Sequence, residues 1–214
     1  GQLQSDVTVF SFYANKTITT GEGGMAVTRH ADIAQRMRVM RLHGMNRDAF
    51  DRFTSRTPAW YYEVVAPGFK YNMTDIAAAM GVEQLARLPD FVARRQYLAG
   101  RYHEQLASLP LTLPAQAPAG DTHAWHLYVI RLKDEAPLAR DDLIQALSDR
   151  GIGTSVHYVP LHRHPYWRDR YQLTPTMFPV ADAAYQAMVS LPLFTAMSDA
   201  EQDHVVAALH EVLG

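Results

Sequence analysis

The chain has 214 residues, of which 48% are hydrophobic, and its 20 Lys and Arg nearly balance its 22 Asp and Glu, giving a formal charge of −2. This length allows one large domain or two small ones, and the balanced charge excludes a histone-like or ribosomal protein and predicts no nucleic-acid partner. Because there is no cysteine, disulfide frameworks, thiolate zinc sites and cysteine nucleophiles are excluded, and a cytoplasmic location is expected. Residues 1–9 do not resemble a signal peptide and no apolar run approaches the roughly 20 residues of a bilayer span, so no membrane partner is expected.

The first predicted elements are two strands around a glycine-rich loop. Apolar residues make residues 5–12 typical of a buried strand, and residues 25–28 predict a second strand. Between them, the tetrad Gly-Glu-Gly-Gly at 21–24 suits positive φ and close backbone approach. Lys16 lies in the same loop, so this segment predicts a specially shaped connection.

Helical spacing dominates the next part of the chain. Residues 32–42 predict an amphipathic helix that ends before Gly44. Many charged and aromatic residues make 46–69 typical of a long irregular loop, and such loops are often functional. Two further helices are predicted over residues 74–88 and 91–109.

Three prolines and a glycine between Leu109 and Asp121 predict a domain boundary, which divides the chain into residues 1–108 and 109–214. Strands and helices then alternate, which favours an α/β fold. The elements predicted in this second part are a strand at 125–132, a helix at 140–150, a strand at 153–158, a loop at 159–178, and helices at 180–190 and 198–213.

Lys16 is the first candidate for chemistry. A lysine between a buried strand and a glycine-rich turn can have a partly desolvated ammonium group, which favours the neutral amine that Schiff-base chemistry needs. The alternative is an ordinary solvated loop lysine, which composition alone favours.

Residues 10–24, FSFYANKTITTGEGG, closely resemble the lysine segment of the fold-type I sugar aminotransferases. Members of that family use pyridoxal 5'-phosphate (PLP) to aminate nucleotide-linked keto-sugars. The resemblance implies that Lys16 forms the Schiff-base link to PLP and that Ser11 hydrogen-bonds the cofactor phosphate. A branch of the family has histidine in place of the lysine and performs dehydration, so Lys16 implies transamination.

The segment GFKYNMTDIAAAMG at 68–81 is similar to a family segment whose Asn and Arg reach across a dimer towards the neighbour's active site. Lys70 and Asn72 occupy those positions here. The resemblance therefore implies a homodimer with shared active sites, in which Lys70 and Asn72 contact the cofactor; a loop lysine and a turn asparagine are the alternative. The resemblance also covers RLHG at 41–44, HAWHLYVIRL at 123–132, RGIGTSVHYVPLHRHPYW at 150–167 and SLPLF at 190–194.

Histidines 157, 162 and 164 invite a metal-site interpretation, because imidazole is a common metal ligand. No clear carboxylate completes a ligand set, so no metal is expected, and a polar, aromatic loop lining a pocket is the simpler interpretation. By resemblance, this loop faces the sugar-nucleotide cleft, which makes His157, Tyr158 and His162 candidate substrate contacts.

The family resemblance implies that residues 1–108 are a remnant of the large PLP-binding domain and that residues 109–214 form the small C-terminal α/β domain. The N-terminal half of the family pattern, with the aspartate that pairs with the pyridine nitrogen, is expected to precede Gly1. The implied activity is transfer of an amino group from an amino acid, by family habit glutamate, to a nucleotide-linked keto-sugar in cell-surface polysaccharide, lipopolysaccharide or antibiotic sugar biosynthesis. The alternative is a non-catalytic module of this fold that acts in binding or dimerisation.

Overall fold

The computed structural model describes residues 4–46 and 61–214, so most of the loop predicted at 46–69 lies outside the described residues. The chain forms two compact units, Gly1–Leu88 and Pro89–Gly214. This division comes 20 residues before the predicted boundary at 108/109, because helix α4 (Leu88–Gln105) packs with the second unit. Its buried apolar side chains belong to the core of that unit: Leu98, Ala99 and Tyr102.

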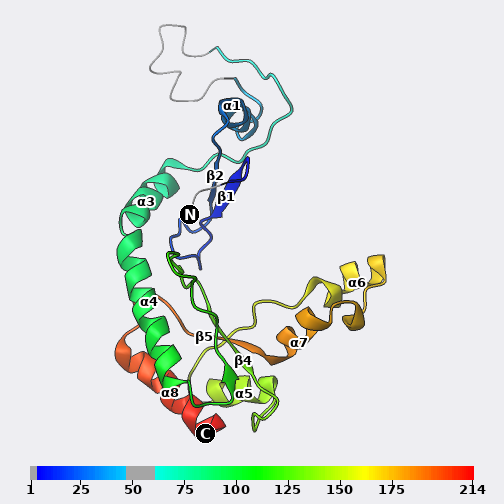
Figure 1. Cartoon of the computed structure of the whole chain (residues 1–214). Coiled ribbons are helices and arrows are strands. Elements are labelled where there is room, and N and C mark those ends of the chain that lie inside the picture. The colour runs from blue at the N-terminus through cyan, green and yellow to red at the C-terminus, as the bar shows by residue number, and fades with distance from the viewer. Residues whose placement is uncertain (1–3, 47–60) are drawn as a thin grey trace. The chain divides into compact units, whose positions relative to one another are not determined.

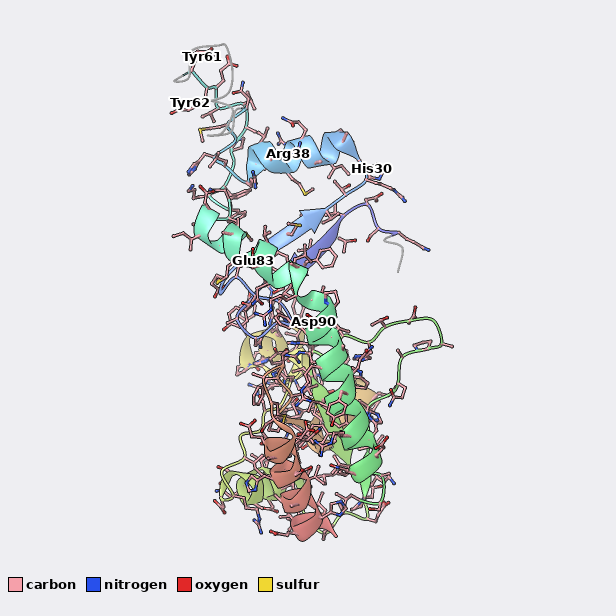
Figure 2. The ribbon with its side chains drawn as sticks, turned by 90° about the vertical axis from the view of Figure 1, so that its left-hand side faces the viewer. His30, Arg38, Tyr61, Tyr62, Glu83 and Asp90 are labelled. Carbon is pink, nitrogen blue, oxygen red and sulfur yellow. The ribbon has the colours of Figure 1, made fainter. Side chains whose placement is uncertain are left out.

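The first unit contains a two-stranded antiparallel sheet of β1 (Thr8–Ser11) and β2 (Gly24–Val27), with Thr8 opposite Val27. Helix α1 (Ala31–Met40) follows β2, and helix α3 (Asp75–Ala86) ends the unit (Figure 1). Figure 2 shows His30 where α1 begins and Arg38 and Glu83 on the two helices. Both strands and both helices were predicted from the sequence within a few residues.

A helix cap and a close backbone approach at a glycine position these elements. Thr74 caps α3, because its hydroxyl accepts a hydrogen bond from Ala77 N at 3.3 Å. Gly44 has a φ of +74° and lies so close to a second backbone segment that a Cβ atom would be 1.7 Å from Ala66 O. Glycine is therefore required where the chain after α1 meets the segment before α3.

The first unit buries little apolar surface. Among its described residues, Val39 is the one apolar side chain that is buried, whereas Val9 is 75% exposed and Ile76 is 83% exposed. Helix α3 buries no residue. The strand predicted at 5–12 is therefore present, and within this chain its apolar side chains are largely uncovered, because the apolar pattern predicts the strand and not which elements cover it.

The second unit is built around a three-stranded antiparallel sheet in the order β3-β4-β5 (Leu111–Thr112, Tyr128–Leu132 and Met188–Leu191). Helices α4, α5 (Arg140–Ser148) and α8 (Asp199–Leu213) lie around it, and Figure 1 shows α4 and α8 side by side. The mixed helix and strand content confirms the α/β class. The fully buried side chains of the core include Leu98, Leu106, Ile130, Leu143, Leu147, Val189 and Leu209.

Polar side chains fix the packing of α8 in this unit. Ser198 and Glu201 form the predicted capping box: the Ser198 hydroxyl accepts from Glu201 N at 3.2 Å, and Glu201 Oε2 accepts from Ser198 N at 2.7 Å. The buried amide of Gln202 donates to Leu98 O at 2.7 Å, which joins α8 to α4. None of the helices in the described part of the chain is long and apolar enough to cross a bilayer.

The segment between α5 and α8 differs most from expectation. The strand predicted at 153–158 is reduced to one bridge between Ser155 and Ser190, and β5 replaces the end of the helix predicted at 180–190. Prolines at the first helical positions start helices where the sequence was interpreted as loop, because proline is also a turn signal. The helical elements of this segment are η1 (Leu161–Arg163), α6 (Pro165–Tyr171), η2 (Pro175–Met177) and α7 (Pro179–Ala187).

Candidate active site

Lys16 lies in the loop that joins β1 to β2, and backbone hydrogen bonds close this loop. Phe12 N donates to Gly23 O at 2.9 Å, and Thr20 N donates to Phe12 O at 3.0 Å, which extends the strand pairing into the loop. Lys16 N donates to Tyr13 O at 2.9 Å, so the segment from Tyr13 to Lys16 is a tight turn. The lysine is thus held on a defined backbone.

Helix α3 supports the same loop through two residues that sequence reasoning missed. Gln84 Oε1 accepts a hydrogen bond from Thr19 N at 3.2 Å. A Cβ atom at Gly81 would lie 3.1 Å from Thr20 Cγ2, so glycine lets the loop approach the helix closely. The available signal was Gly81 itself, because glycine inside a helix costs about 1 kcal/mol relative to alanine and calls for a packing reason.

The side chains of Lys16 and Ser11 are accessible for binding. Lys16 is half-buried and Ser11 is exposed at the end of β1. Ser11 Oγ accepts a long hydrogen bond from Tyr13 N at 3.4 Å, which leaves its hydroxyl hydrogen for another partner. Across residues 4–46 and 61–214, no hydrogen bond or ion pair engages Lys16 Nζ. The loop therefore presents an amine and a hydroxyl without strong internal partners.

Lys70 and Asn72 contact each other, since Lys70 Nζ donates to Asn72 Oδ1 at 2.5 Å. They lie on a segment whose backbone at residues 69–71 pairs with residues 41–43, so two of the motifs quoted above are neighbours in space. In the described residues no hydrogen bond joins this pair to Lys16. The structure thus brings Lys70 and Asn72 together without connecting them to the lysine loop.

In the second unit, His157 is held by β5. His157 Nδ1 lies 2.8 Å from Ser190 Oγ, and the ring packs edge-on against Tyr158 with centroids 4.8 Å apart. The backbones of Ser155 and Ser190 pair in both directions, at 3.2 and 2.7 Å, which fixes the position of the serine. Tyr158 is 65% exposed and is available to a ligand.

His162 has a different environment, because it is 5% exposed and contacts the chain's own side chains. Its Nε2 lies 3.2 Å from Asp182 Oδ1, and its ring stacks on Phe178 at 5.0 Å. Arg163 donates to both Asp182 oxygens, at 2.6 and 3.0 Å. Hydrogen bonds from Arg163 and then from His162 lower the pKa of Asp182 to about 2. His162 is thus held by side chains of the second unit, and its predicted contact with a substrate stays a prediction.

The same cluster continues into α5 and α7. Arg163 and Arg140 each place a guanidinium 5.1 Å from the centroid of the Tyr185 ring, and Arg140 Nη1 also donates to Tyr185 O at 3.1 Å. Asp182, Tyr185 and Arg140 were not predicted, because these contacts join residues that are far apart in the sequence. They fasten η1 to two helices of the second unit.

The metal interpretation of the histidines finds no set of ligands. His164 Nε2 lies 3.2 Å from Val159 O and His162 Nε2 faces Asp182 of α7, so one nitrogen of each ring has a partner within the second unit. In residues 4–46 and 61–214, no three His, Asp or Glu side chains are placed to hold a metal ion.

The chain matches the DegT/DnrJ/EryC1/StrS aminotransferase family over residues 1–210. It belongs to this family. Membership extends over both compact units and includes every site residue predicted above.

Individual relatives agree with this assignment. The spore coat polysaccharide biosynthesis protein SpsC of Bacillus subtilis is 42% identical over 210 residues, which is 97% of this chain and 54% of SpsC. The PLP form of Spr1654 from Streptococcus pneumoniae, classed as a sugar aminotransferase, has a TM-score of 0.84 and 31% identity, over 100% of this chain and 55% of Spr1654. PseC of Helicobacter pylori, an aminotransferase of pseudoaminic acid biosynthesis, has a TM-score of 0.85 and 26% identity, over 98% of this chain and 53% of PseC. The chain spans about half the length of these relatives.

The family and the PLP form of Spr1654 indicate pyridoxal phosphate as the cofactor. The residues of the lysine loop fit this group in their chemistry. A primary amine is the nucleophile that reacts with an aldehyde, and the Lys16 amine has no partner within the described residues. A hydroxyl such as that of Ser11 can donate a hydrogen bond to a phosphate oxygen.

Proposed function

We propose that this chain carries the reactive lysine of a PLP-dependent aminotransferase. The whole protein would transfer an amino group from an amino acid, glutamate by family habit, to a nucleotide-linked keto-sugar. The observation that carries the proposal is the Lys16 amine, which has no partner among the described residues and sits on a loop of the family's lysine type. The relationship to SpsC, a polysaccharide biosynthesis protein, favours a sugar for cell-surface polysaccharide or lipopolysaccharide over one for an antibiotic.

Lys16 would bind the cofactor and move a proton. When bound, the cofactor supplies an electron-withdrawing ring that stabilises negative charge on the donor carbon. An amine on a fixed turn can accept the proton from that carbon and hold it for return to an atom within hydrogen-bond reach, which is the work of a general acid–base. The turn formed by Tyr13 and Lys16, with the support of Gln84, limits the positions that this amine can reach.

Ser11, Lys70 and Asn72 would bind the phosphate. Ser11 offers its hydroxyl hydrogen and Lys70 a positive charge, and both are exposed. The hydrogen bond from Lys70 Nζ to Asn72 Oδ1 keeps the two side chains together, so they would act as one unit. In a homodimer they would do so in the active site of the partner subunit. Sedimentation at several protein concentrations tests the dimer.

His157 and Tyr158 would contact the sugar nucleotide. Tyr158 is exposed, and the described hydrogen bond of His157 occupies one ring nitrogen and leaves the other available. His162 would serve this loop indirectly, because its contacts with Asp182 and Phe178 anchor the end of the segment. A cytoplasmic location completes the proposal, because keto-sugar nucleotides are expected there.

The test uses the fact that the chain has three lysines, Lys16, Lys70 and Lys133. The whole protein is incubated with PLP and treated with borohydride, which fixes the cofactor onto the amine that holds it, and peptide masses identify the lysine. We expect labelling of Lys16 to exceed that of the other two, because Lys70 is hydrogen-bonded to Asn72 and Lys133 lies 3.9 Å from Glu135.

The matched controls are Lys133→Arg, which should leave the label on Lys16, and Lys16→Arg, which should remove it because a guanidinium stays protonated. In the whole protein, Lys16→Ala should abolish transamination with the fold intact. Equal labelling of all three lysines would contradict the proposal and favour a non-catalytic binding module.

A further inference from the structure

Ser190 is a buried hydroxyl with a single described partner. It is 4% exposed on β5, and across the described residues the one hydrogen bond of its Oγ is to His157 Nδ1 at 2.8 Å. Its backbone cannot shift easily, because Ser190 pairs with Val129 of β4 on one side and with Ser155 on the other. The serine is therefore a fixed point against which the imidazole ring rests.

The direction of this hydrogen bond follows from the need to satisfy a buried donor. If the hydroxyl of Ser190 donates to Nδ1 of His157, its hydrogen is paired. If Nδ1–H donated to the hydroxyl instead, the serine hydrogen would be left without a described acceptor, which costs about 1–3 kcal/mol for a buried group. The hydroxyl is therefore the donor when the ring is neutral, and the proton of the neutral ring lies on Nε2.

We infer that Ser190 is a positioning residue that makes Nε2 of His157 a permanent hydrogen-bond donor. The neutral ring carries hydrogen on Nε2 because Nδ1 accepts from Ser190, and the charged ring carries hydrogen on both nitrogens. No described hydrogen bond engages Nε2, and the exposed Tyr158 lies beside the ring. His157 thus presents an N–H group to a ligand oxygen, such as a phosphate or sugar hydroxyl oxygen, and does not act as a base through Nε2.

The identity of the ligand rests on the proposed function, whereas the state of the ring does not. His162, five residues further along the chain, shows the contrast: its Nε2 faces the carboxylate of Asp182 inside the fold, so it presents no such group outward. His157 and His162 would therefore have different roles, with His157 facing a ligand and His162 anchoring the loop.

Nitrogen-15 NMR of the histidine rings tests this inference in the full 214-residue chain, at about pH 9 where imidazoles are neutral. Two-bond nitrogen–proton spectra distinguish a protonated from an unprotonated ring nitrogen, and His157→Gln identifies the His157 signals. We expect an unprotonated Nδ1 and a protonated Nε2. His123 is an internal reference, because its Nδ1 accepts from Trp125 N at 2.9 Å and so has the same tautomer without Ser190.

Ser190→Ala should change the His157 signals to the averaged pattern of a ring that exchanges between tautomers, and should remove the contact between the ring and the side chain at 190. The His123 signals should stay as they are, and this shows that the variant is folded. Ser155→Ala is the matched control, because it removes a neighbouring hydroxyl and keeps the backbone bridge. A protonated Nδ1 in the unmodified chain, or a His157 pattern unchanged by Ser190→Ala, would overturn the inference.

The whole protein separates this inference from the proposed function. If transamination occurs, Ser190→Ala should raise the KM for the keto-sugar nucleotide by about tenfold or less, the equivalent of one hydrogen bond, with little change in kcat. If no transamination occurs but the expected tautomer is found, the proposed function fails and the positioning by Ser190 stands.

Discussion

The two units of the chain differ most in what they bury. The second unit has a continuous apolar core that includes Leu98, Tyr128 and Leu147, all fully buried. In the described residues of the first unit, backbone hydrogen bonds and close glycine contacts fix the lysine loop, and Val39 is the one buried apolar side chain. Within this chain, therefore, local geometry fixes the lysine loop, and burial adds little to its stability.

The difference in burial between the two units predicts unequal losses of stability for a matched pair of leucine truncations. Leu147→Ala in α5 removes a fully buried side chain and should lower the free energy of unfolding by about 2–5 kcal/mol. Leu85→Ala in α3 removes a side chain that is 58% exposed and should change it by no more than about 0.5 kcal/mol. Urea unfolding followed by circular dichroism measures both. Similar losses would show that α3 contributes to the core as α5 does.

A matched pair of glycine substitutions tests whether backbone geometry, and not burial, stabilises the first unit. Gly44→Ala in the first unit should be destabilising by at least about 1–2 kcal/mol, because φ is +74° and the new Cβ would meet Ala66 O. Gly100→Ala in α4 should be stabilising by about 1 kcal/mol, because a Cβ there meets nothing within 4 Å and alanine favours a helix. Thermal unfolding monitored by NMR signals from each unit separates the two effects. A neutral Gly44→Ala would refute the close crossing of the two backbones.

The sequence predicts those elements whose signals are local. Thr74 and Ser198 mark helix starts because a short hydroxyl side chain before a helical pattern is a cap, and both caps are present. Strand β5 was missed because four residues directly after α7 read as the end of a helix. The Asp182 cluster was missed because ion pairs between distant residues leave no pattern in the sequence. The roles of Lys16 and its neighbours came from family resemblance, since composition alone favours a solvated lysine.

Acid should weaken the second unit through Asp182. Hydrogen bonds from Arg163 and His162 lower the pKa of this carboxyl from 3.8 to about 2, so the folded state binds its proton less readily than the unfolded state. The stabilisation is complete above about pH 4 and is lost as the pH falls towards 2. The free energy of unfolding should therefore decrease over this range, and less steeply in Asp182→Asn.

Urea unfolding at a series of pH values measures this slope. A shallower residual slope should remain in the variant, because Asp199 and Glu201 also have lowered pKa values, through hydrogen bonds from Tyr97 and from Ser198. Arg163→Gln should reduce the slope as well, since it removes the larger cause of the shift at Asp182. Parallel curves for the unmodified chain and both variants would show that the cluster does not contribute to acid stability.

The smallest effects on stability are expected from removing two helix caps of similar chemistry, one in each unit. Ser198→Ala removes the capping box of α8, whose inner face includes the buried Leu209, so the loss of about 1 kcal/mol should appear in the unfolding of the whole second unit. Thr74→Ala removes the hydrogen bond to Ala77 N, but α3 buries no residue. Its loss should therefore appear as faster amide hydrogen exchange in the first turn of α3, with little change in the global midpoint. Hydrogen exchange and urea unfolding of both variants measure these two effects. If Thr74→Ala shifted the urea midpoint as much as Ser198→Ala does, α3 would have to unfold together with a buried core.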